Sequence, residues 1–207
     1  MEVFSYRTIN APSIGEFKEK GSKFLAFAYP VTSEEAVKER VAELKKKYFD
    51  ARHHCYAYIL GADKTKFRAV DDGEPNHSAG DPILGQIRSK NLTNVLVVVV
   101  RYFGGVKLGV GGLVSAYKTA AEEALNHATM VEREVLIQYN VRYPYTSTPD
   151  VMKLVKDFEL DILHQSFEAE CKMLMNLSLR SKNTFEEKIA LLNALGVSVS
   201  IEENPVS

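Results

Sequence analysis

VVVVRYFGGVKLGVGGLVSAY, residues 97–117, is the stretch that decides how this chain folds. Its valines belong to the apolar segment 94–102, whose unbroken run predicts a strand buried on both faces. Five glycines between Gly104 and Gly112 then predict a loop. The apolar and small residues that predict the next helix recur at helical spacing: Leu113, Ala116, Tyr117, Ala120, Ala121, Ala124 and Leu125. The stretch therefore predicts a strand, a Gly-rich loop and a helix in direct succession.

Residues 1–133 predict a first domain of mixed strands and helices around this stretch. Further strands are predicted over residues 4–9, 23–31, 55–60 and 67–70, and a short helix over 83–87. The sequence TSEE at 32–35 indicates a capping box at the start of another helix. Lys45, Lys46 and Lys47 lie on the last turn of that helix, where the helix dipole favours positive charge.

Residues 134–207 predict a second, smaller domain. Strands are predicted over 135–142, 161–167, 171–180 and 197–202, and helices from Thr148-Pro149 onward and over 184–195. The order β-α-β-β-α-β is that of a ferredoxin-like fold. The whole chain is therefore predicted to be a two-domain α+β protein.

Composition and charge narrow the class of protein. The chain has 207 residues, of which 45% are hydrophobic and 26% charged, as in an ordinary globular protein. Its longest apolar run, 95–100, is too short to cross a bilayer, and no leader is recognised, so a cytoplasmic location is expected. The two cysteines argue against a disulfide framework or a cysteine-rich zinc site. Because the net charge is −1, any contact with nucleic acid must come from a local patch.

The segment Asp71-Asp72-Gly73-Glu74-Pro75 is a first candidate site. Three carboxylates within four positions could hold a Mg²⁺-type ion through oxygen ligands, or could position a basic group of a partner. Alternatively, the same side chains cap backbone N–H groups in a tight turn. The ligand spacing of an EF-hand is absent. Spacing alone leaves both interpretations open.

The Gly-rich loop is a second candidate. N–H groups at the start of a helix bind anions, and glycines allow a ligand to approach closely. Arg101 and Lys107 would add positive charge, and Tyr102 and Phe103 would offer stacking faces. The loop matches neither a Walker A motif nor a complete dinucleotide fingerprint. Glycines that only permit a tight turn and close helix–sheet packing are the alternative.

Two weaker candidates flank these motifs. In Arg52-His53-His54-Cys55 the histidines could serve a metal or acid–base chemistry, but consecutive strand residues point to opposite faces, so local hydrogen bonding is the simpler interpretation. Ser78 does not match the G-x-S-x-G nucleophile elbow. Cys55 and Ser78 are therefore interpreted as structural or binding residues.

Four motifs together resemble the IMPACT/YigZ family: ARHHCYAYILG at 51–61, DDGEP at 71–75, SAG-x-P at 78–82 and the stretch 97–117. The resemblance covers most of 15–125 and continues into the C-terminal domain of bacterial-type members. It implies an N-terminal domain like the second domain of a small-subunit ribosomal protein, and a C-terminal domain like the ferredoxin-like last domain of elongation factor G. The chain departs from the family at His77-Ser78, where many members have Gly-Thr.

The resemblance implies a translation-linked binding or regulatory protein, because eukaryotic relatives of the N-terminal domain regulate translation. The expected partner is RNA, the ribosome or a translation factor. An enzyme acting on a small phosphorylated or peptide-like substrate at residues 71–74 is the rival hypothesis, and a protein–protein regulator is the third. No catalytic residue, metal ligand or cofactor is predicted. The candidate binding residues are Arg52, His54, Asp71, Asp72, Glu74, Ser78, Arg101, Tyr102, Gly104, Gly105, Lys107, Gly109, Gly111 and Gly112.

Overall fold

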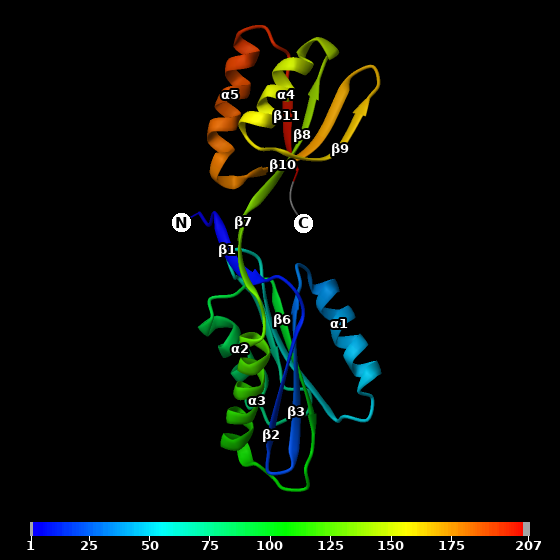
Figure 1. Cartoon of the computed structure of the whole chain (residues 1–207), viewed down its shortest axis with the longest axis vertical. Coiled ribbons are helices and arrows are strands. Elements are labelled where there is room, and N and C mark those ends of the chain that lie inside the picture. The colour runs from blue at the N-terminus through cyan, green and yellow to red at the C-terminus, as the bar shows by residue number, and fades with distance from the viewer. Residues whose placement is uncertain (1, 205–207) are drawn as a thin grey trace. The chain divides into compact units, whose positions relative to one another are not determined.

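The computed structural model describes residues 2–204, which combine helices and strands in two compact units (Figure 1). Ser5–Arg133 form the N-terminal unit. The described residues from Glu134 onward, together with residues 2–4, form the C-terminal unit. The mixed α and β content agrees with the α+β prediction. No helix in this described part of the chain is both long and apolar enough to cross a membrane.

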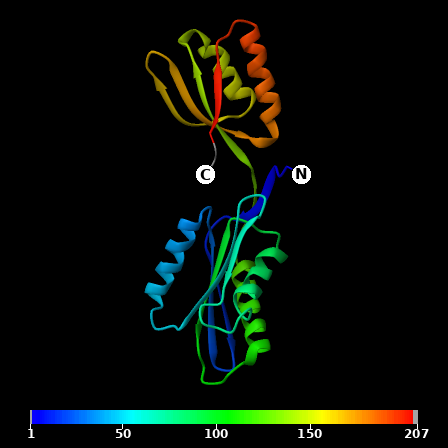
Figure 2. The same ribbon diagram turned by 180° about the vertical axis from the view of Figure 1, so that it is seen from behind.

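The N-terminal unit is built on a five-stranded antiparallel sheet. Its strands, in spatial order, are β2 (Ser13–Glu19), β3 (Ser22–Pro30), β6 (Val95–Tyr102), β4 (His53–Leu60) and β5 (Lys66–Val70). Helices α2 (Gly80–Ser89) and α3 (Gly109–Asn126) cover one face, and α1 (Glu34–Lys47) covers the other, as Figures 1 and 2 show. Outside this sheet, β1 (Ser5–Ile9) pairs with β7 (Met130–Glu134).

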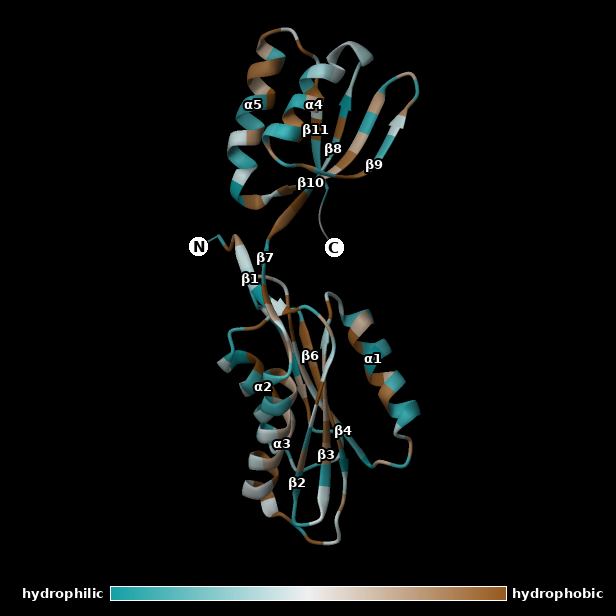
Figure 3. Ribbon diagram, in the orientation of Figure 1, coloured by the Kyte–Doolittle hydropathy of each residue, from teal (hydrophilic) through white to brown (hydrophobic). Residues whose placement is uncertain are grey.

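Strand β6 shows why the unit has three layers. Val95, Val97 and Val99 pack into the core under α2 and α3, and the alternate residues of the strand pack into the core under α1. Every side chain from Val95 to Val100 is fully buried, and Figure 3 shows the strand as hydrophobic. The prediction that this strand is buried on both faces is confirmed, since a run without polar residues fits only between two apolar layers.

Several boundaries in the N-terminal unit differ from the sequence prediction. Ser33, rather than Thr32, caps α1, and its Oγ accepts a hydrogen bond of 3.2 Å from the N–H of Ala36. Helix α3 begins at Gly109, inside the glycine stretch, and Leu108 at its N-cap packs against the core. Strands β2 and β7 were not predicted.

The C-terminal unit is a four-stranded antiparallel sheet with helices on one face. Its elements are β8 (Leu136–Tyr143), α4 (Thr148–Asp157), β9 (Asp161–Phe167), β10 (Cys171–Ser178), α5 (Lys182–Ala194) and β11 (Ser200–Asn204). The spatial order of the strands is β11-β8-β10-β9. Alternate residues of β8 and β10 share one core with Val151 of α4 and Phe185 of α5. The predicted element order β-α-β-β-α-β is observed.

Candidate functional site

Four connections lie at one end of the five-stranded sheet. They are the β2–β3 turn at 20–21, the α1–β4 connection at 48–52, the β5–α2 loop at 71–79 and the β6–α3 loop at 103–108. The strand register brings them together, because Arg101 on β6 lies between Phe24 on β3 and His53 on β4. This loop end therefore gathers the candidate residues that the sequence spreads from 52 to 112.

A buried ion pair joins two of these loops. Nη1 of Arg101 lies 2.6 Å from Oε1 of Glu74, and the two side chains are only 7% and 4% exposed. The hydroxyl of Tyr117 donates a second hydrogen bond, of 2.8 Å, to the same oxygen, and the thiol of Cys55 donates to that hydroxyl over 3.3 Å. Buried charges are costly unless they are paired in this way. Glu74 and Arg101 therefore hold the loop end together.

The position of Arg101 corrects the expectation that it adds charge to an exposed anion site. Its guanidinium lies 5.5 Å from the ring centroid of Phe24 and 5.7 Å from that of Phe103. Ser22 Oγ lies 3.5 Å from its Nη2 and accepts a 3.2 Å hydrogen bond from the N–H of Gly104. These contacts make Arg101 the anchor of the β6–α3 loop instead of a surface cation.

Asp71 fixes the start of α2. Its carboxylate accepts hydrogen bonds of 2.8–3.0 Å from the N–H groups of His77, Ala79 and Gly80. Burial acts to raise the pKa of this carboxyl, but the three donors outweigh it and hold the pKa below its ordinary value. The carboxylate is thus used as a cap, which is why α2 begins at Gly80, earlier than local sequence indicates.

Asp72 links the acidic loop to α1 and β4. Its carboxylate accepts a 2.8 Å hydrogen bond from the N–H of His54 and pairs with Nζ of Lys45 at 3.1 Å. The His54 side chain is buried, and this burial lowers its pKa despite the nearby Asp72 carboxylate. Nδ1 of His53 lies 2.9 Å from the carbonyl oxygen of Asp72. Because the two histidines are consecutive residues of β4, their side chains point to opposite faces of the sheet, as predicted.

The two candidate nucleophiles are both occupied in the fold. The hydroxyl of Ser78 is buried and donates a 2.6 Å hydrogen bond to the carbonyl of Pro75. Burial raises the pKa of the Cys55 thiol far above its ordinary value, so the thiol stays protonated. In residues 2–204, no group of three His, Cys, Asp or Glu side chains is placed to hold a metal ion.

The five glycines of the β6–α3 stretch have different roles. A Cβ on Gly104 would lie 1.9 Å from the carbonyl carbon of Gly21, so this glycine permits two backbones to pack together. Gly105 and Gly109 have φ of 89° and 72°, which glycine adopts without strain. Gly111 faces open space, and a Cβ on Gly112 would meet only the Leu108 side chain. Four of the five glycines therefore shape an accessible loop and helix start.

The surface of this loop is apolar and basic. Phe103, Val106 and Val110 are 52–57% exposed, and Lys107 between them is exposed and forms no ion pair within residues 2–204. Helix α3 has no capping side chain and no acidic residue in its first turn. Its first N–H groups are therefore available to an anion.

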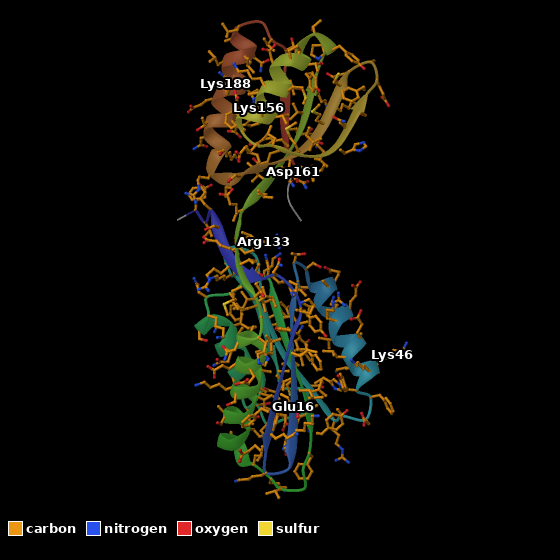
Figure 4. The ribbon with its side chains drawn as sticks, viewed as in Figure 1. Glu16, Lys46, Arg133, Lys156, Asp161 and Lys188 are labelled. Carbon is orange, nitrogen blue, oxygen red and sulfur yellow. The ribbon has the colours of Figure 1, made fainter. Side chains whose placement is uncertain are left out.

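The α1–β4 connection extends this surface. Phe49, which sequence reasoning did not select, is 84% exposed, and Arg52 beside it is exposed as well. The hydroxyl of Tyr102 donates a 2.8 Å hydrogen bond to Asp50, which raises the pKa of Tyr102 to about 12 and fixes this connection to the end of β6. Lys46 points from α1 away from the sheet (Figure 4). The available signal for Phe49 was a second aromatic residue, after Tyr48, in the polar segment that follows the lysine run.

Comparison with known proteins assigns this arrangement to a family. The family described as the Impact N-terminal domain matches residues 20–125, which run from the β2–β3 turn almost to the end of α3 and include all four connections. The chain belongs to the IMPACT family. The resemblance drawn from the four sequence motifs is thereby confirmed.

Other members match this IMPACT family chain over different lengths. IMPACT family member YvyE of Bacillus subtilis is 34% identical over 170 residues, or 81% of this chain and 78% of YvyE. Protein IMPACT of Mus musculus is 34% identical over 137 residues, or 64% of this chain but 37% of the mouse protein. A solved crystal structure of a hypothetical protein, 29% identical, superposes with a TM-score of 0.75 and covers 97% of both chains.

Proposed function

We propose that this IMPACT family member is a translation-linked binding and regulatory protein that contacts RNA of the translation apparatus through the loop end of its N-terminal unit. The observation that carries this proposal is the surface of the β6–α3 loop. There Lys107, which forms no ion pair with any described residue, lies between exposed apolar side chains, next to a helix start that lacks an acidic residue. Membership of the IMPACT family supports the link to translation.

The chemistry of this surface fits single-stranded or looped RNA. Phe103 and Phe49 offer rings on which bases can stack, and base–aromatic stacking tolerates many sequences. Lys107, Arg52 and the first N–H groups of α3 are positioned to neutralise or hydrogen-bond to phosphates. The buried Glu74–Arg101 pair keeps the loop in place, so the surface is formed before a partner arrives.

The rival enzyme hypothesis has less support. Asp71 caps α2, Asp72 pairs with Lys45 and Glu74 is buried against Arg101, so each carboxylate of the acidic loop already has a structural partner. We propose that this loop orients the binding surface, without acting as an acid, a base or a magnesium ligand.

The fold assignments that the resemblance implies are also proposed. The strand order β11-β8-β10-β9, with both helices on one face, supports a ferredoxin-like C-terminal domain over residues 134–207 like the last domain of elongation factor G. We propose that residues 1–133 form a domain like the second domain of a small-subunit ribosomal protein. Two domains of translation-type folds agree with the proposed function.

Binding to purified ribosomes and to short RNA across a salt series tests the proposal. Lys107→Ala and Arg52→Ala should each weaken binding and reduce the slope of log K against log salt by about 0.7–0.9 per lost phosphate contact. Lys38→Ala is the matched control, because Lys38 is an exposed lysine near the start of α1, at the other end of that helix from Lys46. Equal affinity and slope in all variants and the parent protein would overturn the proposal.

A protein partner is a second candidate, and a separate observation favours it. Val106 and Val110 are more than half exposed, and removing such apolar surface from water on contact with a protein is favourable. Val106→Ser/Val110→Ser should then abolish binding to a translation factor while leaving the salt dependence of RNA binding unchanged. Pull-down with purified elongation factors, compared with the Lys107→Ala variant, separates the two candidates.

A further inference from the structure

One face of the C-terminal sheet is left uncovered by the helices of its unit. Residues of β8 and β10 that share the core with α4 and α5 alternate with residues that point the other way. The register shows which outward residues are neighbours: Arg142 lies opposite Lys172, Asn140 opposite Leu174, and Gln138 opposite Asn176. Each of these side chains is exposed or half-buried. The open face is defined by these six residues and their neighbours on β9 and β11.

Amide side chains dominate the middle of the open face. Asn204 of β11, Gln138 of β8 and Asn176 of β10 form one row across three strands, and Asn140 lies in the next row. Asparagine is depleted in strands, because a pleated, half-exposed surface favours β-branched and aromatic residues. Three asparagines on one face therefore oppose local strand preference, which is expected where a face serves a partner more than it serves stability.

Two cations lie side by side at one end of the open face. Arg142 and Lys172 are directly opposite each other on adjacent strands, an arrangement that is unfavourable for like charges unless an anion lies between them. Glu202 reaches Arg142 only at 4.0 Å, and Lys172 forms no ion pair with the residues that the structure describes. The pair is therefore a ready site for a phosphate group.

We infer that the open face binds single-stranded RNA, with Arg142 and Lys172 on the backbone and the amides of Gln138, Asn140 and Asn176 on base edges. An amide offers a donor and an acceptor together, as base edges require. A four-stranded sheet with helices on one face is a known platform for single strands. This face is independent of the loop end and adds a second contact for the same class of partner.

Other features of the open face favour RNA over a protein. Among the described residues, the strand positions that face away from the helices are mostly polar or charged, whereas the core of a protein interface is depleted of charged residues. The exposed apolar side chains on these strands include Leu136 and Leu163. His164, opposite Leu174, supplies a ring for one base. The acidic groups of the face, Glu202 and Asp161, lie on the two edge strands, and Asp161 accepts a 3.4 Å hydrogen bond from Asn176. The carboxylates of the open face therefore lie on its edge strands, away from the central pair β8 and β10.

The full chain with Asn140→Thr/Asn176→Thr tests the inference. Threonine suits strands better than asparagine, so the unfolding temperature should stay the same or rise. Affinity for labelled oligoribonucleotides of about 12 nucleotides should fall about tenfold, and the preference between homopolymers of A, C and U should shrink. A residue with only a structural role would lower stability instead. Gln165→Thr, on the helix-facing side of β9, is the matched control.

A second variant, Arg142→Gln/Lys172→Gln, isolates the phosphate contacts. The slope of log K against log salt should decrease by about 0.7 for each cation removed. The control variant Lys156→Gln, on helix α4 (labelled in Figure 4), should leave the slope unchanged. If both open-face variants bind RNA like the parent protein while Lys107→Ala is impaired, the inference is overturned and the proposed function stands. If only the open-face variants are impaired, the inference holds and the loop-end proposal fails. Tighter binding to the matched oligodeoxyribonucleotides, or no RNA binding by the parent protein, also overturns the inference.

Discussion

The two sheets of this protein differ in how many of their faces are covered, and the difference decides where each can bind a partner. Strand β6 of the N-terminal unit is buried from Val95 to Val100, between α2 and α3 on one side and α1 on the other. Strand β8 of the C-terminal unit buries only alternate residues, from Ile137 to Tyr143. A sheet covered on both faces leaves its loop ends and its edge strands for binding, whereas a sheet covered on one face also leaves the side chains of its open face.

The largest expected effect comes from removing a glutamate that accepts a tyrosine hydrogen bond in each unit, because the glutamate of the N-terminal unit also neutralises a buried arginine. Glu74→Ala would leave Arg101 buried without a counter-charge and should lower the free energy of unfolding by about 3–5 kcal/mol. Glu186→Ala in the C-terminal unit removes the acceptor of the Tyr139 hydroxyl, which is largely a single hydrogen bond, and should cost about 0.5–1.5 kcal/mol.

Urea unfolding followed by circular dichroism measures both variants, and hydrogen exchange shows which unit loses protection. The double variant Glu74→Ala/Arg101→Met should recover much of the loss, because an apolar pair replaces the stranded charge. Equal losses for Glu74→Ala and Glu186→Ala would contradict the distinction between the two sites.

Threonine substitutions on the two central strands give a second contrast. Val98→Thr places a hydroxyl in a fully buried layer and should destabilise by about 1–3 kcal/mol. Gln138→Thr lies on the open face of β8 and should change stability by less than about 0.5 kcal/mol. Thermal unfolding of each variant measures the difference, and a similar cost at both positions would show that the open face is covered in solution.

Alanine substitutions at two glycines of the β6–α3 stretch distinguish a position packed against another backbone from one that faces solvent. Gly104→Ala forces the backbone away from Gly21 and should destabilise by about 1–3 kcal/mol. Gly111→Ala adds a methyl group to open space in the first turn of α3 and should stabilise by about 0.4–1 kcal/mol. Denaturant midpoints decide, and destabilisation by Gly111→Ala would place that residue in a packed contact.

The smallest expected effect is the pH dependence contributed by His54. Burial lowers its pKa in the folded chain, so the unfolded chain binds this proton first as pH falls below about 6.5. Stability should therefore fall between that pH and the lower pKa of the folded state, and stay level below it. His54→Gln should flatten this part of the profile. An unchanged profile in His54→Gln would contradict the assignment.

The fold could be predicted wherever burial follows a simple period. The valines of β6 and the spacing of Leu113, Tyr117 and Ala120 gave the correct central strand and helix, because local sequence and tertiary burial agree there. Strand β2 was missed because its sequence SIGEFKE is mostly polar. It packs closely against α3 at Gly15, where an added Cβ would lie 2.4 Å from the backbone nitrogen of Ala124. A contact of this kind between backbones leaves no hydrophobic pattern in the sequence.

The candidate site could be located from sequence, but several roles could not. Asp71, Glu74 and Arg101 do gather at the loop end. Glu74 and Arg101 are 27 positions apart, however, and nothing local shows that their charges neutralise each other. The expected exposure of Arg101 was wrong, since its side chain is buried, and the exposed Phe49 was not selected at all.

The order of strands in the N-terminal sheet also constrains how the chain folds as it is synthesised. Strand β3 pairs with β2, which precedes it, and with β6, whose partner residues follow 65–79 positions later, from Pro30↔Val95 to Lys23↔Tyr102. At about 5–20 residues per second, the ribosome needs roughly 3–16 seconds to deliver β6 after β3. During that interval the side chains of Phe24 and Phe27 lack the β6 residues that complete the two cores in which they are buried. Until β6 has been synthesised, the apolar side chains of β3 are therefore open to aggregation and to chaperones.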